Sequence, residues 1–307
     1  MTTRMFGAPV RRREDPRLVT GNGRYLDDLG VGALEASFVR SPHAHARVLD
    51  VDVSGALDVA GVVAVWTWED LEGAAAEPLP MLVPHPSIEH PVTGRALVKD
   101  EVNHVGEPVV MVVATDRYVA EDAAQRIVVR YEFREPVVGV AAAREAARLV
   151  HEEAPGNVAA HLVQEVGDAP GRIEAAPHAL ELNLDIERSA CMPMEGRGVL
   201  ARWDAEDGRL RVHASTQTST GVRAALAAKL GLPLDRVEVI APDIGGGFGV
   251  KIMHPWPEDV CVAAAACRLR ASVKWTEDRR EHFVGSAHER QQLQRVRVGF
   301  DDDGRVH

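Results

Sequence analysis

The chain has 307 residues, of which 46% are apolar and 26% charged, and its net charge at pH 7 is −11. This length and balance indicate a folded protein of about two domains, and the acidic excess disfavours nucleic acid as its main partner because phosphate backbones would be repelled. No apolar run approaches the roughly 20 residues that cross a bilayer, and the N-terminal segment lacks the apolar core of a secretory signal, so we expect a cytoplasmic protein.

The first region, after a charged lead-in at residues 1–17, is predicted to be rich in strands. Runs of β-branched and alternating residues predict strands at Leu34–Val39, Ala46–Val53 and Gly61–Trp68. The stretch Glu77–Pro91 contains five prolines. It is predicted to be an extended surface loop, because proline lacks the N–H that helices and ladders need.

A strand, a helix and a second strand follow with short connections. The apolar runs Pro108–Ala114 and Ile127–Phe133 predict the two strands. Between them, Asp116 is a suitable N-cap for a helix over Arg117–Arg126. This order is typical of an α/β or α+β layer and not of a helical bundle.

Residues 135–177 are rich in alanine, proline and glycine and have weak periodicity, which indicates a linker. We therefore predict a first domain at residues 18–133, a linker at 134–155 and a second domain at 156–307.

The second domain is predicted to mix strands and helices. Strict alternation predicts half-buried antiparallel strands at Leu180–Arg188 and Leu210–His213. A helix over Gly221–Leu230 is predicted to start after the Ser219-Thr220 cap and to stop at Gly231. Apolar runs predict a second helix and three further strands, at Glu258–Leu269, Arg236–Ala241, Ser272–Trp275 and Leu293–Phe300.

The last residues have the pattern of a hairpin whose second strand has barely begun. Asp301–Gly304 is an acidic turn that ends in glycine, and alternation resumes at Arg305. We expect the strand Leu293–Phe300 to have an exposed, unpaired edge, as if the sequence were cut inside a hairpin.

The sharpest local feature is GGGFG at residues 245–249, directly after a predicted strand. Glycines around one aromatic residue let the backbone approach a ligand closely, with amides free to hold an anion or an oxo group. The spacing is neither GxGxxG nor that of a P-loop. A glycine bulge or a tight strand turn explains the same run without a ligand, and the local pattern leaves both open.

Two other polar motifs have both a binding and a structural interpretation. Gln217 lies just before a predicted helix, where its side-chain amide can donate to a bound group, although the local pattern alone favours a simple capping cluster. His43 and His45 have the i, i+2 spacing of ligands on one face of a strand. No third ligand lies near them in sequence, which favours a polar turn over a metal site.

The remaining charged and sulfur-containing residues point to no chemistry of their own. Glu195 and Arg197 are predicted to form an ion pair, either buried between strands or solvated, and Asp278–Glu281 is predicted to be a solvated loop. The three cysteines form no CxxC pair, which excludes a disulfide scaffold and leaves no iron–sulfur or zinc motif.

Several segments together resemble the molybdopterin-binding large subunit of the xanthine dehydrogenase, aldehyde oxidase and carbon monoxide dehydrogenase family. In chain order they are VTGNGRYLDDL, SFVRSPHAHARVLDVDVSGAL, GEPVVMVVATDRYVAEDAAQRIVVRYE, MPMEGRGVLARWD, the stretch from STQTST to GGGFGVK, and VKWTEDRREHFVGSAHER. The resemblance covers nearly the whole chain and is closer to the carbon monoxide dehydrogenase branch than to the xanthine branch. It implies an α+β fold, with an a/b hammerhead domain at residues 18–133 and the first part of a molybdopterin-binding domain at 156–307.

The resemblance also implies a function, which is hydroxylation by a molybdenum hydroxylase with water as the oxygen source. In the family, the glutamine of the TQ segment hydrogen-bonds an oxo ligand of the molybdenum centre, and this carries over to Gln217. The Phe-Gly pair of GGGFG lies against the same ligands and carries over to Phe248 and Gly249, while Gly246 and Gly247 provide the close backbone approach. The implied cofactor is molybdopterin, in its simple or its cytosine dinucleotide form, and the implied partners are an iron–sulfur subunit and an FAD-binding subunit.

Some positions depart from the family pattern. The family usually has proline where this chain has Gly196, and the xanthine enzymes often have a substrate-recognising glutamate where this chain has Ile252, which disfavours a purine substrate. The sequence is also shorter than half of a full family subunit. We therefore expect the catalytic glutamate and most pterin contacts to lie in the missing C-terminal part or in a complementing chain.

The sequence thus identifies no catalytic residue and no metal ligand within this chain. The alternative to a partial enzyme subunit is a non-catalytic truncated remnant, or an assembly module, without bound cofactor.

Overall fold

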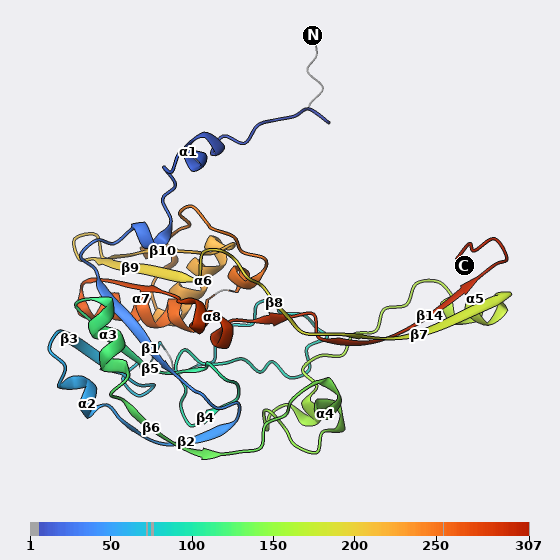
Figure 1. Cartoon of the computed structure of the whole chain (residues 1–307), viewed down its shortest axis with the longest axis horizontal. Helices are drawn as coiled ribbons and strands as arrows, with labels where there is room; N and C mark the ends of the chain where they lie inside the picture. The colour runs from blue at the N-terminus through green and yellow to red at the C-terminus, as the bar shows by residue number, and fades with distance from the viewer. Residues whose placement is uncertain (1–5, 72, 75–76, 254, 307) are drawn as a thin grey trace, which may run out of the picture.

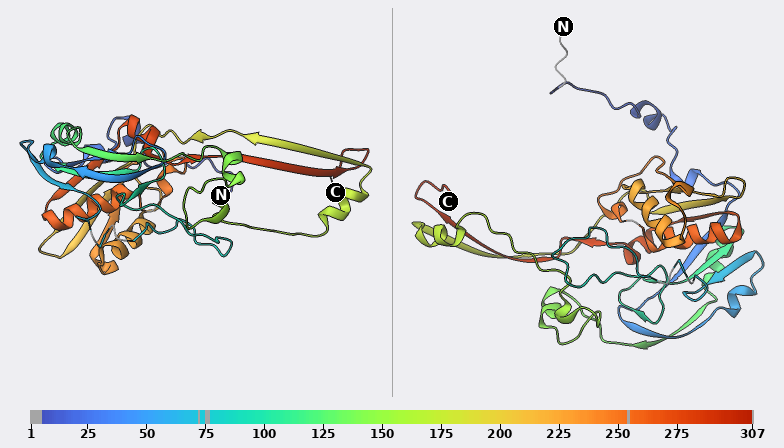
Figure 2. Two further views of the ribbon diagram at one scale, coloured as in Figure 1. Left: turned by 90° about the horizontal axis from the view of Figure 1, so that it is seen from below. Right: turned by 180° about the vertical axis from the view of Figure 1, so that it is seen from behind.

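The computed structural model describes residues 6–71, 73–74, 77–253 and 255–306. Its body contains a seven-stranded mixed sheet, and a two-stranded ribbon projects from that body (Figure 1; Figure 2). In spatial order the seven strands are β11 (Val237–Ile240), β10 (Arg209–Ala214), β9 (Gly198–Asp204), β12 (Ser272–Thr276), β1 (Leu34–Arg40), β5 (Pro108–Ala114) and β3 (Val62–Trp66).

Strands from both sides of the predicted linker meet in this sheet. β1 runs parallel to β12, with Leu34 opposite Val273 and Glu35 opposite Lys274. The first and second regions of the chain therefore share a backbone ladder, so they do not form separate sheets. The boundary at 134–155 stays a prediction.

The apolar run in β5 is buried because both faces of the sheet are covered. Met111 and Val113 pack in the core beneath α7 (Pro257–Leu269) and α6 (Ser219–Leu230). Val110 and Val112 alternate to the other face, against α3 (Arg117–Ala124) and a three-stranded sheet. That second sheet has the order β4 (Glu101–Val102), β2 (Ala46–Asp52) and β6 (Val128–Phe133). A strand buried on both faces has a continuous apolar sequence, as PVVMVVA does.

The predicted elements agree closely with those of the structure. Asp116 caps α3 by accepting from the Val119 amide at 3.0 Å, and residues 77–91 contain no helix or strand. α6 begins at Ser219, two residues earlier than predicted, because Thr218 and not Thr220 is its N-cap. It ends, as predicted, at Gly231, whose φ of +63° is left-handed.

The pattern missed β9 and several short elements. The short helices and strands are α1 (Asp15–Val19), α2 (Ser54–Leu57), α4 (Val140–Glu145), α5 (Ala169–Ala175), α8 (Arg279–Gly285), β4, β8 (Ser189–Ala190) and β13 (His288–Glu289). No helix in the described part of the chain has the length and apolar character needed to span a membrane.

The projecting ribbon consists of β7 (His178–Ile186) and β14 (Gln292–Phe300), paired antiparallel along nine residues each (Figure 2). The predicted pairing type is correct, but the predicted half-burial of β7 is wrong. Leu180, Leu182 and Leu184 point to one face and are 48%, 43% and 42% exposed, because no described segment covers that face. On its other edge, β14 carries only the isolated Phe300–Val306 bridge among the described residues.

A buried charge network corrects two predictions. Glu195 and Arg197 do not pair with each other: Arg197 contacts Glu277 at 2.6 Å and Glu258 at 3.1 Å, whereas Glu195 contacts Lys251. The segment Asp278–Glu281 is not a solvated loop either. Asp278 caps α8 and the carboxylate of Glu281, in its first turn, accepts from Arg40 of β1 at 3.0 Å.

The buried first turn of α7 yields a pH-dependent prediction. Burial, with a further contribution from the neighbouring Glu258 charge, raises the pKa of Asp259 to about 7. In the unfolded chain the carboxyl titrates near 3.9, so the folded state keeps a proton that the unfolded state releases as pH rises. Relative to a neutral side chain, Asp259 therefore costs stability progressively between about pH 4 and pH 7.

Asp259→Asn removes this titration and keeps an oxygen that can accept from the Trp256 amide, as Asp259 does at 2.9 Å. We expect the variant to gain up to about 4 kcal/mol over the wild type between pH 4.5 and pH 8, which is about three pKa units. Urea unfolding of both proteins at the two pH values measures the gain. Parallel pH profiles would show that Asp259 titrates normally.

Candidate functional site

The glycine run lies in the connection from β11 to a short 3₁₀ turn, η4 (Val250–Ile252). Three of its residues are left-handed: φ is +103° at Gly246, +52° at Phe248 and +91° at Gly249. A phenylalanine in this region is strained, and such strain persists only where surrounding contacts hold it. The Phe248 ring is nevertheless 70% exposed, so backbone contacts and not burial of the ring hold this conformation.

Gln217 and the glycine run, which are predicted separately, lie in direct contact. The backbone amide of Gly249 donates to Oε1 of Gln217 at 3.1 Å, and the backbone amide of Gln217 donates to the Lys251 carbonyl at 2.9 Å. A Cβ at position 247 would lie 2.5 Å from Oε1 of Gln217. Gly247 is therefore required for the side chain of Gln217 to lie across the loop.

The side chain of Gln217 contacts the glycine run and does not cap α6. Gln217 precedes Thr218, the N-cap of α6, and its side chain is directed at the loop. Oε1 accepts from Gly249, and Nε2 carries the two hydrogens that the side chain can donate to a ligand. Within the described residues, neither that Nε2 nor the amides of Gly246, Gly247 and Phe248 donate a hydrogen bond. One side-chain amide and three backbone amides thus form a set of available donors.

Sequence reasoning missed the residues that support this loop from behind. The Cys191 thiol donates to the Phe248 carbonyl at 2.8 Å, and the His282 ring lies 2.7 Å from the Cys191 carbonyl through Nε2. Burial raises the pKa of the Cys191 thiol, so it keeps the proton that it donates. Nδ1 of His282 contacts Glu277 at 2.9 Å, which links the loop to the buried charge network. No sequence motif indicates these contacts, because they depend on how the chain folds.

The two histidines of the SPHAHAR segment contact different neighbours. His43 packs edge-on against Tyr131 and Phe133, and Nε2 of His45 lies 2.7 Å from Glu101. Within the described residues, no group of three or more histidine, cysteine, aspartate or glutamate side chains could hold a metal ion.

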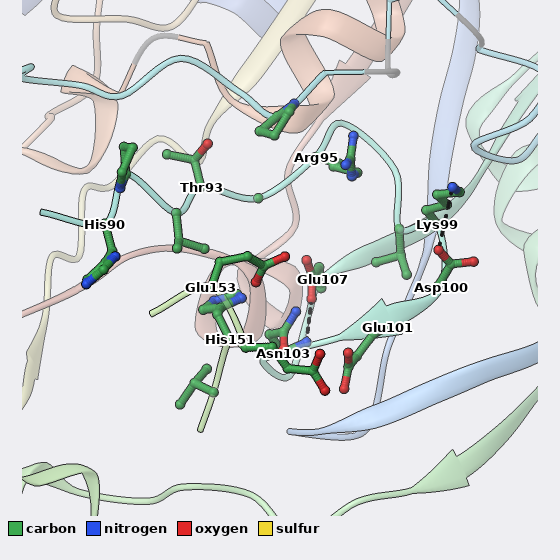
Figure 3. Close-up of a pocket in the computed structure, with 17 residues that line it drawn as sticks. His90, Thr93, Arg95, Lys99, Asp100, Glu101, Asn103, Glu107, His151 and Glu153 are labelled. Atoms are coloured by element: carbon green, nitrogen blue, oxygen red, sulfur yellow. Dashed lines mark hydrogen bonds and ion pairs between the residues drawn. The ribbon is translucent and has the colours of Figure 1, made fainter. Parts of the chain in front are cut away.

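A cavity of about 500 Å³ lies elsewhere, between residues 90–107 and 150–153 (Figure 3). Its wall mixes cationic and anionic side chains, among them Arg95, Lys99, Glu107 and Glu153. Glu107, which is buried, accepts from the Asn103 amide at 2.7 Å. Neither Gln217 nor the glycine run lines this cavity, so it is separate from the donor set.

Comparisons with known proteins identify related sequences along the whole chain. The family described as "Molybdopterin cofactor-binding domain" matches residues 150–307, and "Aldehyde oxidase and xanthine dehydrogenase, a/b hammerhead domain" matches residues 20–135. The large subunit of nicotine 6-hydroxylase from Paenarthrobacter nicotinovorans is 37% identical over 100% of this chain and 37% of its own length. The large chain of carbon monoxide dehydrogenase from Afipia carboxidovorans is 32% identical over 98% of this chain and 38% of its own.

Solved structures agree with these relatives. Quinoline 2-oxidoreductase from Pseudomonas putida 86 superposes with a TM-score of 0.84 at 33% identity, over 97% of this chain and 38% of that one. The chain therefore spans little more than a third of the length of the relatives that it matches.

Proposed function

Because the chain belongs to the family of molybdopterin-binding subunits of molybdenum hydroxylases, we propose that it provides one wall of a molybdenum cofactor site. The observation that carries the proposal is that Nε2 of Gln217 and the amides of Gly246, Gly247 and Phe248 donate to no described residue, although Gln217 lies against the glycine run. In this proposal the donors belong to a hydroxylase that takes its oxygen from water.

The chemistry of the donor set fits an oxygen-rich, anionic group. Consecutive backbone amides next to left-handed residues form concave anion sites, and a neutral side-chain amide adds a donor without adding charge. The absence of side chains at positions 246 and 247 leaves the backbone accessible, since both glycines are partly exposed. When bound, the molybdenum cofactor would supply the two-electron redox chemistry of the hydroxylation.

The role of this chain's own residues in that site is to bind and orient. Gln217 and the amides of residues 246–248 would donate to oxygen atoms of the cofactor, and Phe248 would cover it with an exposed ring. The Gly249 amide holds the oxygen of Gln217, so that Nε2 is the end of the side chain that would donate to the cofactor. The cofactor is molybdopterin or its cytosine dinucleotide, and cytidine monophosphate released on acid hydrolysis distinguishes the two.

The substrate that we propose is a nitrogen heteroaromatic ring other than a xanthine-like purine. Two of the relatives are named for nicotine and quinoline, at 37% and 33% identity. Ile252 stands where xanthine enzymes often have a polar, substrate-recognising glutamate, and it is 39% exposed in η4, three residues after the glycine run. An apolar side chain there offers no hydrogen bond to the oxo groups of a purine.

The ribbon supports a proposal about partners. The relatives include a large subunit and a subunit of a dehydrogenase complex, which this chain matches along nearly all of its length. The face of the ribbon that carries Leu180, Leu182 and Leu184 is apolar and uncovered by described residues, whereas Glu181 on the opposite face pairs with Arg295. We propose that polypeptide equivalent to the unspanned part of the large subunit covers the apolar face. Iron–sulfur and FAD-binding subunits would complete electron transfer.

Gln217→Glu tests the cofactor site in the loaded assembly. The variant keeps the oxygen that accepts from Gly249 but replaces the Nε2 donor with a carboxylate oxygen, which would repel an anionic cofactor. We expect turnover to fall about 10²–10³-fold, the usual effect of removing one preorganised donor, and molybdenum content per chain to fall with it. Dye reduction with nicotine or quinoline and elemental analysis measure the two effects.

The matched control is Gln125→Glu, at the exposed C-terminal end of α3, which should change neither value. Full turnover and full molybdenum content in Gln217→Glu would contradict the assignment. A wild-type assembly without molybdenum would instead favour the assembly-module alternative.

Leu182→Glu tests the partner surface, because it places a charge in the middle of the apolar face. Its control, Asn183→Glu, adds the same charge to the next residue, on the opposite face. The probe is the portion of the nicotine 6-hydroxylase large subunit outside the matched span, supplied as a separate polypeptide. We expect Leu182→Glu to weaken binding at least tenfold and to reduce self-association in sedimentation. Equal behaviour of the two variants would refute the surface.

A further inference from the structure

The carboxylate of Glu195 accepts hydrogen bonds from three residues in or beside the glycine run. Its Oε2 atom accepts from the Gly245 amide, from the Ser215 hydroxyl and from Nζ of Lys251, each at 2.8 Å. Its own amide donates to the Gly245 carbonyl at 3.1 Å. A Cβ on Gly245 would lie 2.5 Å from Cβ of Glu195. The carboxylate therefore fixes the first residue of the glycine run through both its side chain and its backbone.

Lys251 fixes the other end of the run. Its side chain is fully buried, with 0% of its surface exposed. Its carbonyl accepts from the Gln217 amide at 2.9 Å and from the Thr216 hydroxyl at 3.2 Å. Lys251 thus contacts Glu195 through its ammonium group and Gln217 through its backbone carbonyl. Glu195 in turn holds Gly245, at the start of the glycine run, and Gln217 holds Gly249, at its end.

The energetic cost of Lys251 makes its position informative. Burial lowers the pKa of the ammonium group, and the Glu195 carboxylate opposes that shift. An apolar side chain of similar volume would avoid the cost, because a buried ion pair contributes little net stability compared with packed apolar groups. The pair does, however, supply two charge-assisted contacts of fixed direction at the base of the loop.

We propose that Glu195 and Lys251 are positioning residues that hold the glycine run in register with Gln217, so that the four available donors face one ligand. The last step, the identity of the ligand, rests on the proposed function. The holding itself does not. Neither residue belongs to the donor set, since their charged groups contact each other and Glu195 contacts Gly245.

A purely structural ion pair is the competing explanation, and the same fold contains one for comparison. Lys274 of β12 is buried and lies 3.4 Å from Glu35 of β1, on the strand pair that joins the two regions. No contact links Lys274 to Gln217 or to the glycine run within the described residues. Lys274→Met is therefore the matched control for Lys251→Met.

Amide hydrogen exchange on the full chain without cofactor tests the holding directly. In Lys251→Met, we expect exchange at Gly245 and Gly249 to rise about 10- to 100-fold, the range for loss of one charge-assisted hydrogen bond. Exchange in β9 and α7 should stay unchanged. Lys274→Met should leave Gly245 and Gly249 as in the wild type. Unchanged exchange at both glycines in Lys251→Met would overturn the proposal, and so would a uniform rise throughout the chain.

Exchanging the two charges separates positioning from simple pairing. In the double variant Glu195→Lys/Lys251→Glu, the opposite charges are restored, but an ammonium group at position 195 cannot accept from the Gly245 amide. We expect exchange at Gly245 to stay fast in the double variant. Recovery of wild-type protection at Gly245 would show that the pair is only structural and would overturn the proposal.

Molybdenum content of the loaded assembly provides the link to function. We expect Lys251→Met to retain at most half the metal per chain that Lys274→Met retains. If the wild type binds no molybdenum, the proposed function fails while the exchange result still decides the positioning. If the two variants retain equal molybdenum per chain although amide exchange at Gly245 is fast in Lys251→Met, the claim that holding the loop promotes ligand binding is overturned.

Discussion

The buried carboxylate of Glu258, in the first turn of α7, contacts both regions of the chain next to the strand pair β1–β12 that they share. It contacts Arg40 of β1 at 2.7 Å and Arg197, just before β9, at 3.1 Å. Burial alone would raise the pKa of Glu258, but the two guanidinium groups hold it below its ordinary value, so the carboxylate stays ionised. Arg40 comes from the first region and Arg197 from the second. Removing one partner of such a group typically costs about 3–5 kcal/mol, because the other charge stays buried.

The same network leads to the candidate site. Arg197 also contacts Glu277, which contacts His282, whose ring reaches the Cys191 carbonyl next to the thiol that holds Phe248. The left-handed Phe248 is thus supported by a chain of hydrogen bonds that begins at the sheet. The loop that carries the donors is thus hydrogen-bonded to a buried network, which is what a preorganised binding wall requires.

The sequence predicts the local part of this arrangement well. Alternation, apolar runs and a cap locate β1, β5, α3 and α7, because these signals depend on neighbours within one or two turns. Gln217 and GGGFG are found as separate motifs, and their contact follows only from the resemblance to a family. Burial is less predictable: the alternating β7 has the pattern of a half-buried strand, yet that pattern does not say which segment covers it.

Local sequence patterns do not predict which charged residues pair over long sequence distances. Glu195 and Arg197 are two residues apart, which suggests a pair, but their actual partners are Lys251 and Glu277, 56 and 80 residues away. The intervening strands and helices determine which charges meet. β9 is missed for a related reason, since its first four residues are all buried and show no alternation.

The most direct test of the central claim is a structure of the chain in its cofactor-loaded assembly. We expect oxygen atoms of the cofactor about 2.7–3.2 Å from Nε2 of Gln217 and from at least one amide among Gly246, Gly247 and Phe248. A cofactor bound elsewhere, with Gln217 and the glycine run in contact with protein alone, would contradict that claim.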